Sequence, residues 1–541
     1  MSSKLAYSLP AKVKVAAFQL PPMDTINLKQ HQQVLAGALC IAIVLLFVRR
    51  WILRWSAKRH CAFGDLKTAG TPIPKEKKRK CAVIVGASIS GILSARICAD
   101  HFEKVVLIDA ENCTTDPTVK RKRVKQHEQL HLFLGLMYPA LTKLFPGFIE
   151  EVKKAGGSVA PPQPVVYRGG GFVKVPLTAD EWETRQLYIS REVLEALLRC
   201  LVLERFPHVT AIHGNVTDLN ATGDTVKSAT LKRPDGSMEN IEGDLFLDCS
   251  GTANGSIGWL RKLGYNKPDK MTYDPQIVYT CFTFQMTPEM VQKFNKLGGP
   301  YTWEETGHLG ACFSADHHSV FMKIDNDRVR TMYQTYVGRG GEPETPEDLL
   351  AAVRRAPYQD WQKAAVAMLC GEGMDKEPEY VMTRVTIGQC YRVTYRSKDM
   401  PRNMLPLGDS ILRVNPIFGQ GCTKSVIEIL TLDNALRKFS GKPTSRKMVD
   451  YYLDLRYART DAFWEDTRLL DYACEDTKPL AGETAETGAT YRRFKSWVVQ
   501  AAQKDTSVGK TLTETMSALR PATILYDPSF IMRCWLAHIF G

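Results

Sequence analysis

Uncharged, apolar residues run without a break from Val34 to Val48 near the N-terminus. At about 1.5 Å per residue this run is short for a hydrocarbon core of roughly 30 Å, but the uncharged stretch extends back to Gln30. Trp51 and Trp55 follow where an interfacial aromatic belt is expected. The pattern predicts a single membrane-spanning helix over 34–55.

A cleaved signal peptide and a buried core helix are the alternatives for this run. A signal peptide usually begins nearer the first residue and ends in an A-x-A-like site, which the sequence lacks. Basic residues cluster after the run, and only Lys29 lies just before it. By the positive-inside rule we expect a single-pass protein of the endoplasmic reticulum whose body is cytosolic.

Strand-length and helix-length patterns then follow one another over 81–109. The β-branched runs 81–85 and 104–109 flank a helical run at 92–99. A glycine-bearing turn separates the first run from the helix. This order predicts a βαβ unit and places the chain in the α/β class.

Length and composition allow a large folded body. A chain of 541 residues is longer than a single hydrophobic core usually serves, and 44% of its residues are apolar. The net charge is +13, with much of the excess near the apolar run, which suits an anionic membrane surface. No RNP, zinc-finger or helix-turn-helix signature is present, so no nucleic-acid partner is expected. The 14 cysteines form no CxxC pair, which is typical of reduced thiols in a cytosolic protein.

The turn of the βαβ unit suits a dinucleotide. Glycine permits the tight turn, and a second glycine lets the helix lie close to the sheet, with free N–H groups for a pyrophosphate. Asp109 follows about 20 residues on and can accept hydrogen bonds from ribose hydroxyls. A βαβ unit without a ligand is the alternative. The predicted contacts in the turn are Gly86, Ser88 (in place of the middle glycine), Ile89, Ser90 and Gly91.

Two later segments make the cofactor more specific. The strand of 244–251 runs into a glycine turn, and Pro406–Ser410 is followed by the loop Asn415–Gly421, which opens a helix. Together with the first turn, these segments resemble the signature of the flavoprotein monooxygenase superfamily, the group of aromatic hydroxylases and squalene epoxidase. The resemblance spans roughly residues 81–480 and implies FAD.

The resemblance also implies site residues. Asp409 would contact the ribityl chain of FAD, and the helix after the loop would face the flavin, where its dipole favours negative charge. The segment from Arg123 to Gly147 looks like the branch that contains bacterial polyether epoxidases, and Arg191 lies in a segment like the family's arginine-bearing helix. The further implied FAD contacts are Arg123, Arg191, Asp248, Gly251, Pro416, Gly419, Gln420, Gly421 and Cys422.

The implied architecture is a Rossmann-like FAD-binding domain with an inserted antiparallel β-sheet substrate domain, C-terminal helices and an N-terminal transmembrane helix. A turn at 325–327 between β-rich runs predicts a hairpin in the insertion. The expected parts are an N-terminal segment 1–33, a membrane anchor 34–55, a basic linker 56–80, the FAD-binding domain 81–270 and 386–445, a substrate domain 271–385 and a helical region 446–541.

The chemistry that the resemblance implies belongs to the cofactor. Reduced FAD reacts with O₂ to a C4a-hydroperoxide, which transfers one oxygen atom to the substrate, so we nominate no catalytic side chain and no metal. Electrons would come from NAD(P)H, directly or through a flavin or cytochrome reductase. A membrane anchor suggests a lipophilic substrate such as a terpenoid or polyketide of secondary metabolism, and both epoxidation and hydroxylation are open. The candidate lining residues, for which ordinary sheet core is the alternative, are Phe282, Phe284, Met322 and Tyr333.

Other functions compete with this hypothesis. A prenyl-chain reductase would share the cofactor, and an FAD-fold escort protein would show no turnover. The segment His127-Glu128-Gln129-Leu130-His131 matches the HExxH pattern of zinc metalloproteases, although basic residues precede it and no third ligand is apparent. The apolar tail 530–540 suits either the membrane surface or packing on the body.

Overall fold

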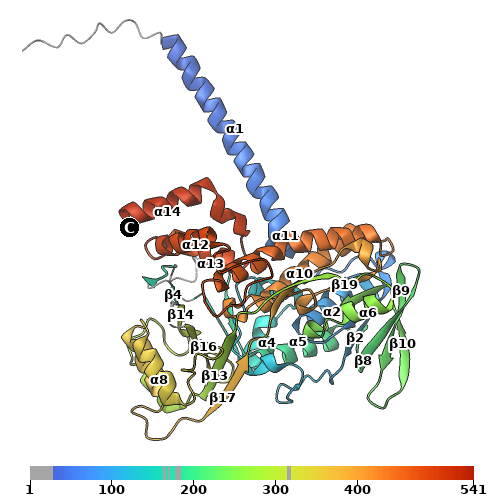
Figure 1. The fold of residues 1–541 in the computed structure, drawn as a ribbon, viewed down its shortest axis with the longest axis horizontal. Helices are drawn as coiled ribbons and strands as arrows, with labels where there is room; N and C mark the ends of the chain where they lie inside the picture. The colour runs from blue at the N-terminus through green and yellow to red at the C-terminus, as the bar shows by residue number, and fades with distance from the viewer. Residues whose placement is uncertain (1–27, 163–165, 169–170, 177–183, 314–317) are drawn as a thin grey trace, which may run out of the picture. The chain divides into compact units, whose positions relative to one another are not determined.

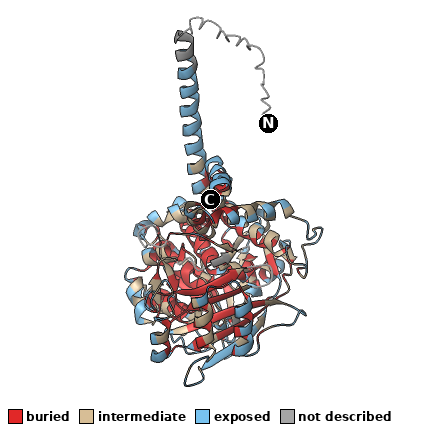
Figure 2. Ribbon diagram, turned by 90° about the vertical axis from the view of Figure 1, so that its left-hand side faces the viewer, coloured by how far each residue is buried: buried red, intermediate tan, exposed pale blue. Residues whose placement is uncertain are grey.

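The computed structural model describes residues 28–162, 166–168, 171–176, 184–313 and 318–541. The chain divides into two units, 1–55 and 56–541. The first contributes most of helix α1, Leu28–His60 (Figure 1). Within the described residues, this is one helix long and apolar enough to cross a membrane, with a mean hydropathy of 2.1 over its most apolar window and no buried residue there. Figure 2 colours its exposed residues pale blue.

A parallel sheet forms the centre of the second unit. Its strands lie in the order β19-β11-β1-β2-β7, and each neighbouring pair is parallel. Their bounds are Arg79–Val85 for β1, Phe102–Asp109 for β2, Val209–His213 for β7, Leu245–Asp248 for β11 and Met404–Pro406 for β19. Four of these strands are largely buried, apolar runs, as expected for a sheet covered on both faces, whereas the edge strand β7 is mostly exposed.

Long helices cover this sheet. Helix α2, Ile89–His101, connects β1 to β2 and is buried along nearly its whole length, because small residues let it lie between β1 and α10. Helix α10 is Gln420–Lys438, and α11, Arg446–Asp471, packs along it (Figure 1). The other helices of this region are α3 (Met137–Leu144), α4 (Phe148–Lys154), α5 (Arg191–Arg205) and α6 (Gly255–Lys262).

A second, seven-stranded sheet has the order β17-β13-β16-β15-β14-β4-β5. Its neighbouring strands are antiparallel except for the pair β14 and β4. Strands β15 and β16 form the predicted hairpin. The bounds are Val166–Arg168 (β4), Gly171–Phe172 (β5), Ile277–Gln285 (β13), His308–Phe313 (β14), His318–Lys323 (β15), Arg328–Tyr336 (β16) and Tyr380–Thr386 (β17). One face packs on α7 (Pro288–Phe294), α8 (Pro346–Arg355) and α9 (Asp360–Leu369).

Smaller sheets and C-terminal helices complete the unit. The remaining strands are β3 (Ser158–Ala160) with β6 (Gln186–Tyr188), β8 (Asn215–Thr222) with β9 (Thr225–Lys232) and β10 (Met238–Glu242), and β12 (Asp269–Tyr273) with β18 (Cys390–Thr394) and β20 (Leu412–Arg413). The predicted helical end consists of α11, α12 (Ala489–Ala502), α13 (Thr506–Met516) and α14 (Pro528–Phe540). The expected mixed α/β architecture is confirmed.

The expected linker differs from the structure. Helix α1 continues to His60, and Ala62 and Ala69 are buried in the core. Small apolar residues among the basic ones allow this segment to pack rather than to remain extended. Every buried cluster of the described residues lies within 56–541, so this unit holds its own core.

Candidate functional site

The three predicted segments meet at one edge of the parallel sheet. Val85, at the end of β1, pairs with Asp248, at the end of β11, and Asp248 pairs with Pro406 of β19. The carboxyl ends of parallel strands lie on the same edge, which is where ligands bind in open α/β sheets. The turns that follow these three strands are therefore neighbours, although more than 300 residues separate the first from the last.

Two glycines make this close approach possible. Gly86 follows β1 with a φ of 107°, and a Cβ there would overlap the carbonyl oxygen of Cys249. Gly408 has a φ of 69°, and a Cβ there would overlap the hydroxyl of Ser90. Only glycine fits both the positive φ and the space. Gly86 thus joins the first turn to the second, and Gly408 joins the third turn to the first.

Helix α10 begins at this junction without a side-chain cap. Gly419, in left-handed conformation, is the N-cap residue of the helix and has no side chain to bond its first N–H groups. Gln420 and Cys422 are buried, whereas a Cβ at Gly421 would meet open space. Among the described residues, the buried Thr423 Oγ1 has no hydrogen-bond partner. The helix start therefore offers free donors and room beside them.

Asn415 holds the turn before α10 in place. Its Oδ1 accepts hydrogen bonds from the Ile417 backbone N–H at 3.1 Å and from the Tyr279 hydroxyl at 3.0 Å. Its Nδ2 donates to Asp471 Oδ1 at 2.9 Å, and the Tyr273 hydroxyl donates to Asp471 Oδ2 at 2.7 Å. Burial raises the pKa of Asp471 to about 7. The Pro416–Phe418 turn is thus fixed by a buried polar chain that sequence reasoning missed.

Asp409 presents an ionised carboxylate at the same junction. Its Oδ1 lies 2.9 Å from Nζ of Lys424, which is fully buried on α10. Burial alone would raise the pKa of Asp409, but the Lys424 ammonium group lowers it below its ordinary value. The Asp409 side chain remains 34% exposed. Among the described residues it is therefore a charged acceptor that pairs with Lys424 and has further lone pairs.

A buried glutamate organises the charged groups behind the first turn. Glu195 of α5 is fully buried. Its carboxylate contacts Ser88 Oγ at 2.6 Å, Arg191 Nε at 2.8 Å, His127 Nε2 at 3.2 Å, Arg199 at 3.4 Å and Arg121 at 3.6 Å. Burial would raise the pKa of Glu195, but Arg191 and His127 lower it well below its usual range. The spacing of Arg191, Glu195 and Arg199 at every fourth position was the available signal for this cluster.

Asp109 lies at the predicted place but is already occupied. Its carboxylate accepts hydrogen bonds from the backbone N–H groups of Ala87 at 2.6 Å and Glu111 at 2.8 Å, and from Arg121 at 2.7 Å. A ribose at this position would replace the Arg121 pair. Arg123, the predicted contact, is exposed. Arg121, two residues earlier, reaches the turn instead and donates to the Ala87 carbonyl at 3.2 Å.

Asp248 supports the site from within. Its Oδ1 accepts from the backbone N–H of Ser250 at 2.9 Å, and its Oδ2 accepts from the backbone N–H at 2.7 Å and the hydroxyl of Ser256. Ser410 also donates to its backbone carbonyl at 3.0 Å. The structure thus gives Asp248 a role in holding the second and third turns together. Gly251, with a φ of 65°, faces open space.

The HExxH segment does not form a helical zinc site. Residues Lys125–Glu128 form a short 3₁₀ helix, and the chain is irregular beyond it. His127 contacts Glu195, and His131 Nε2 accepts a hydrogen bond from Arg191 at 3.1 Å while Nδ1 faces the Gln129 carbonyl at 3.0 Å. Burial and the Arg191 charge lower the pKa of His131 to about 3. Within the described ranges no group of three or more His, Cys, Asp or Glu could hold a metal.

An apolar cavity of about 130 Å³ lies against the Pro416–Phe418 turn. Its walls come from the turn, the segment 132–135, β14 and helix α13. The lining residues include Leu132, Leu134, Val173, Val175, Ala311, Phe313, Ile417, Phe418, Leu512 and Met516, with Arg168, Gln186 and His308 as polar members. Burial lowers the pKa of His308 to about 4, so its imidazole is neutral. The C-terminal helix was not anticipated as a wall.

The four predicted lining residues are not among those that line this cavity. Phe282 and Phe284 are buried in the cluster between the antiparallel sheet and α7–α9, and Tyr333 packs against that cluster. Met322 is buried beside Tyr188. Neighbouring residues of a strand face opposite sides. Tyr279 and Cys281 of β13 therefore lie on the side of the strand that packs with Ile417. Phe282 and Phe284 lie in the cluster with α7–α9.

Known proteins resemble this chain more in fold than in sequence. No family model matches the chain. Protein Rv3254 of Mycobacterium tuberculosis (strain ATCC 25618 / H37Rv) is 24% identical over 365 residues, which are 66% of this chain and 73% of the relative. The flavin-dependent brominase Bmp2 superposes with a TM-score of 0.56 at 15% identity, over 85% of this chain and 98% of the brominase.

Two monooxygenases show the same arrangement. The p-nitrophenol 4-monooxygenase PnpA of Pseudomonas putida DLL-E4 gives a TM-score of 0.55 at 17% identity, over 82% of this chain and 100% of PnpA. PqsL of Pseudomonas aeruginosa, described as a probable FAD-dependent monooxygenase, gives 0.51 at 18% identity, over 73% and 97%. This chain has the flavin-dependent monooxygenase fold. The resemblance drawn from its sequence motifs is confirmed at the level of the fold.

Proposed function

We propose that the protein is a membrane-anchored, FAD-dependent monooxygenase that oxidises a lipophilic substrate. The observation that carries this proposal is the meeting of three turns at one sheet edge, with Asp409 and the uncapped start of α10 beside an apolar cavity. The parallel sheet would be the Rossmann-like dinucleotide domain, and the antiparallel sheet the inserted substrate domain.

The residues at the junction fit the flavin half of FAD. The open space at Gly421, the unpaired Thr423 hydroxyl and the free N–H groups of α10 suit the polar edge of an isoalloxazine ring. Asp409 would accept hydrogen bonds from ribityl hydroxyls. The turn before α2 would hold the pyrophosphate, with Arg121 displaced from Asp109 by the ribose. Bound FAD, once reduced, supplies the oxygen activation; NAD(P)H is the proposed source of electrons, directly or through a reductase.

The cavity supports a substrate with an apolar body and one polar end. Its walls are mainly aliphatic and aromatic side chains, which exclude water, and Arg168, Gln186 and His308 are placed to orient a carbonyl, hydroxyl or carboxylate. We propose a terpenoid or polyketide as the substrate class, with epoxidation or hydroxylation as the reaction. The exposed apolar stretch of α1 supports attachment to a membrane, because exposing so many apolar side chains to water is unfavourable.

Colour and flavin content test the cofactor. The purified protein should be yellow, and Asp409→Ala should lower its affinity for FAD at least tenfold, by about 1.4 kcal/mol, because a charge-assisted hydrogen bond is lost. Asp218→Ala is a matched control, since Asp218 is 37% exposed and pairs with Lys262 at 2.8 Å, much as Asp409 pairs with Lys424. Equal FAD retention in the two variants would refute the role of Asp409.

Oxygen consumption tests the reaction. A monooxygenase should consume O₂ in a stoichiometric ratio to an oxidised lipophilic substrate when NAD(P)H and a reductase are supplied. Reduction of a prenyl chain without substrate-linked O₂ use would favour the prenyl-chain reductase instead. A flavin-loaded protein that turns over none of the lipids would support an escort role.

A further inference from the structure

Helix α14 is apolar on two faces, and the described body covers one of them. Phe530, Cys534 and Ala537 are buried in a cluster with α12 and α13. The opposite face consists of large apolar side chains that are between 38% and 80% exposed: Ile531, Met532, Trp535, Leu536, Ile539 and Phe540. Apolar side chains that form a continuous stripe on a helix indicate a binding surface, whereas single exposed apolar residues do not.

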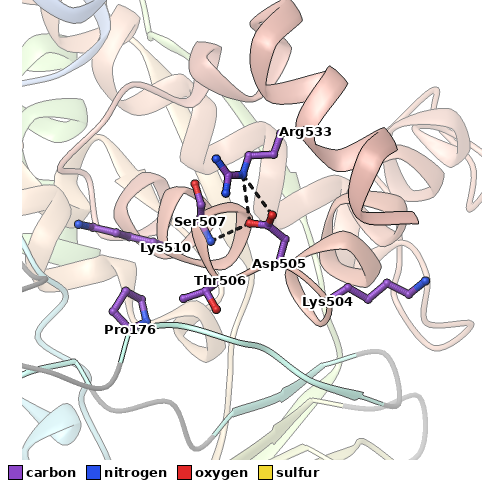
Figure 3. A pocket seen from close by; sticks show the side chains of 7 residues that line it. All are labelled: Pro176, Lys504, Asp505, Thr506, Ser507, Lys510 and Arg533. Atoms are coloured by element: carbon purple, nitrogen blue, oxygen red, sulfur yellow. Dashed lines mark hydrogen bonds and ion pairs between the residues drawn. The ribbon is translucent and has the colours of Figure 1, made fainter. Parts of the chain in front are cut away.

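A basic depression borders this stripe. It has a volume of about 520 Å³ and is lined by Pro176, Lys504, Asp505, Thr506, Ser507, Lys510 and Arg533. Three of these residues are cationic and one is acidic, so the depression carries a net charge of about +2. Figure 3 shows Arg533 turned to Asp505, with which it pairs at 3.2 Å, whereas the ammonium groups of Lys504 and Lys510 extend away on either side.

We propose that α14 binds the surface of an anionic phospholipid membrane, with its exposed apolar face in the interfacial layer and the basic depression at the headgroups. The helix has 13 residues, about 20 Å in length, which is too short to cross a hydrocarbon core. An apolar helix face with a basic border is the pattern of helices that lie in the membrane plane. Trp535, half-exposed in the middle of the stripe, is an aromatic residue suited to the interface.

This contact would belong to the unit 56–541, and the route of substrate entry that it suggests rests on the proposed function. Leu512 of α13 belongs both to the cluster beneath α14 and to the wall of the apolar cavity. A membrane on the exposed face of α14 would thus be separated from the cavity by two packed helices, α14 and α13. A lipophilic substrate would then reach the cavity from the bilayer without crossing water.

Vesicle flotation tests the proposal with a chain of residues 56–541, which holds its own core and lacks the apolar stretch of α1. A cooperative thermal transition of this chain checks its folding. We expect it to float with phosphatidylcholine vesicles that contain phosphatidylserine. Met532→Asp should weaken this binding at least tenfold, because an apolar contact is replaced by a charge near anionic lipid. Met238→Asp is the matched control, since Met238 of β10 is 56% exposed and Met532 is 55% exposed.

The basic border has its own test. Replacing Lys504 and Lys510 together by glutamine should lower the preference for phosphatidylserine over phosphatidylcholine by about tenfold, and added salt should do the same. The pair Lys262→Gln and Lys293→Gln, on other surfaces, should leave it unchanged.

Three results would overturn the proposal. The first is absence of vesicle binding by the folded chain, and the second is equal binding by the Met532→Asp and Met238→Asp variants. The third is a dimer, seen by sedimentation, that Met532→Asp converts to a monomer while vesicles are not bound; the face would then contact a second copy. None of these measurements needs bound flavin, so failure here is distinct from failure of the proposed oxidation.

Discussion

Glu195→Gln should destabilise the body more than any surface exchange of the same kind. The carboxylate is fully buried and joins guanidinium groups of Arg191, Arg199 and Arg121 to Ser88. Removing one partner from a buried ion pair typically costs about 3–5 kcal/mol, because the remaining charges stay buried without compensation. Glutamine keeps the volume and one acceptor, so the cost should fall at the lower end of that range.

Urea denaturation of the full chain in detergent, followed by tryptophan fluorescence, measures this effect. The control is Glu204→Gln, an exposed position on the same helix, which should change the free energy of unfolding by less than about 0.5 kcal/mol. The midpoint for Glu195→Gln should be clearly lower. Equal midpoints for the two variants would refute the claim that Glu195 organises the buried arginines.

The pH dependence gives an independent check on the same residue. The folded pKa of Glu195 lies below its ordinary value of 4.5. Its stabilising contribution is therefore present above pH 4.5 and is lost as the pH falls toward the folded pKa. The wild-type protein should lose stability in this acidic window, and Glu195→Gln should lack that share of the loss.

Three further predictions concern other residues. Burial raises the pKa of Asp471 from 3.8 to about 7, so its contribution to stability should be present below pH 4 and be lost as the pH rises to 7; the unfolding free energy of Asp471→Asn should lack this decline, and parallel pH profiles would contradict it. Met516→Trp should fill the apolar cavity and abolish substrate-dependent O₂ use while flavin absorbance persists; unchanged turnover would show that the substrate binds elsewhere. If the body is cytosolic, glycosidase treatment should cause no mobility shift at the sequons whose asparagines are exposed, Asn112, Asn215 and Asn220, and a shift would reverse the orientation; the fourth, Asn254, is buried and tests nothing.

Local spacing along the chain was enough to predict the βαβ unit, the hairpin and the start of α10. Gly86 and Gly408 indicate turns at the ends of strands, because few residues other than glycine adopt the positive φ that such a turn needs. The roles of Asp409 and of the loop before α10 were instead implied by the resemblance of their motifs to the flavoprotein monooxygenase signature. The apolar character of α1 and α14 is likewise a property of the sequence alone.

The sequence did not predict the direction of side chains in irregular segments. Between 121 and 123 three basic residues follow one another, and only packing decided that Arg121 turns inward while Arg123 faces solvent. The HExxH pattern assumes a helix, but the chain leaves helical conformation after Glu128, and its histidines join the Glu195 cluster instead.

The sequence by itself determined which residues are turns, strands and apolar helices, because those properties depend on neighbours a few positions apart. Only the tertiary structure decided which face of β13 meets the turn before α10, that α13 closes the cavity from nearly 100 residues farther along, and that one face of α14 stays uncovered. Each of these depends on contacts between distant segments, and alternation or periodicity specifies two faces without saying what each one touches.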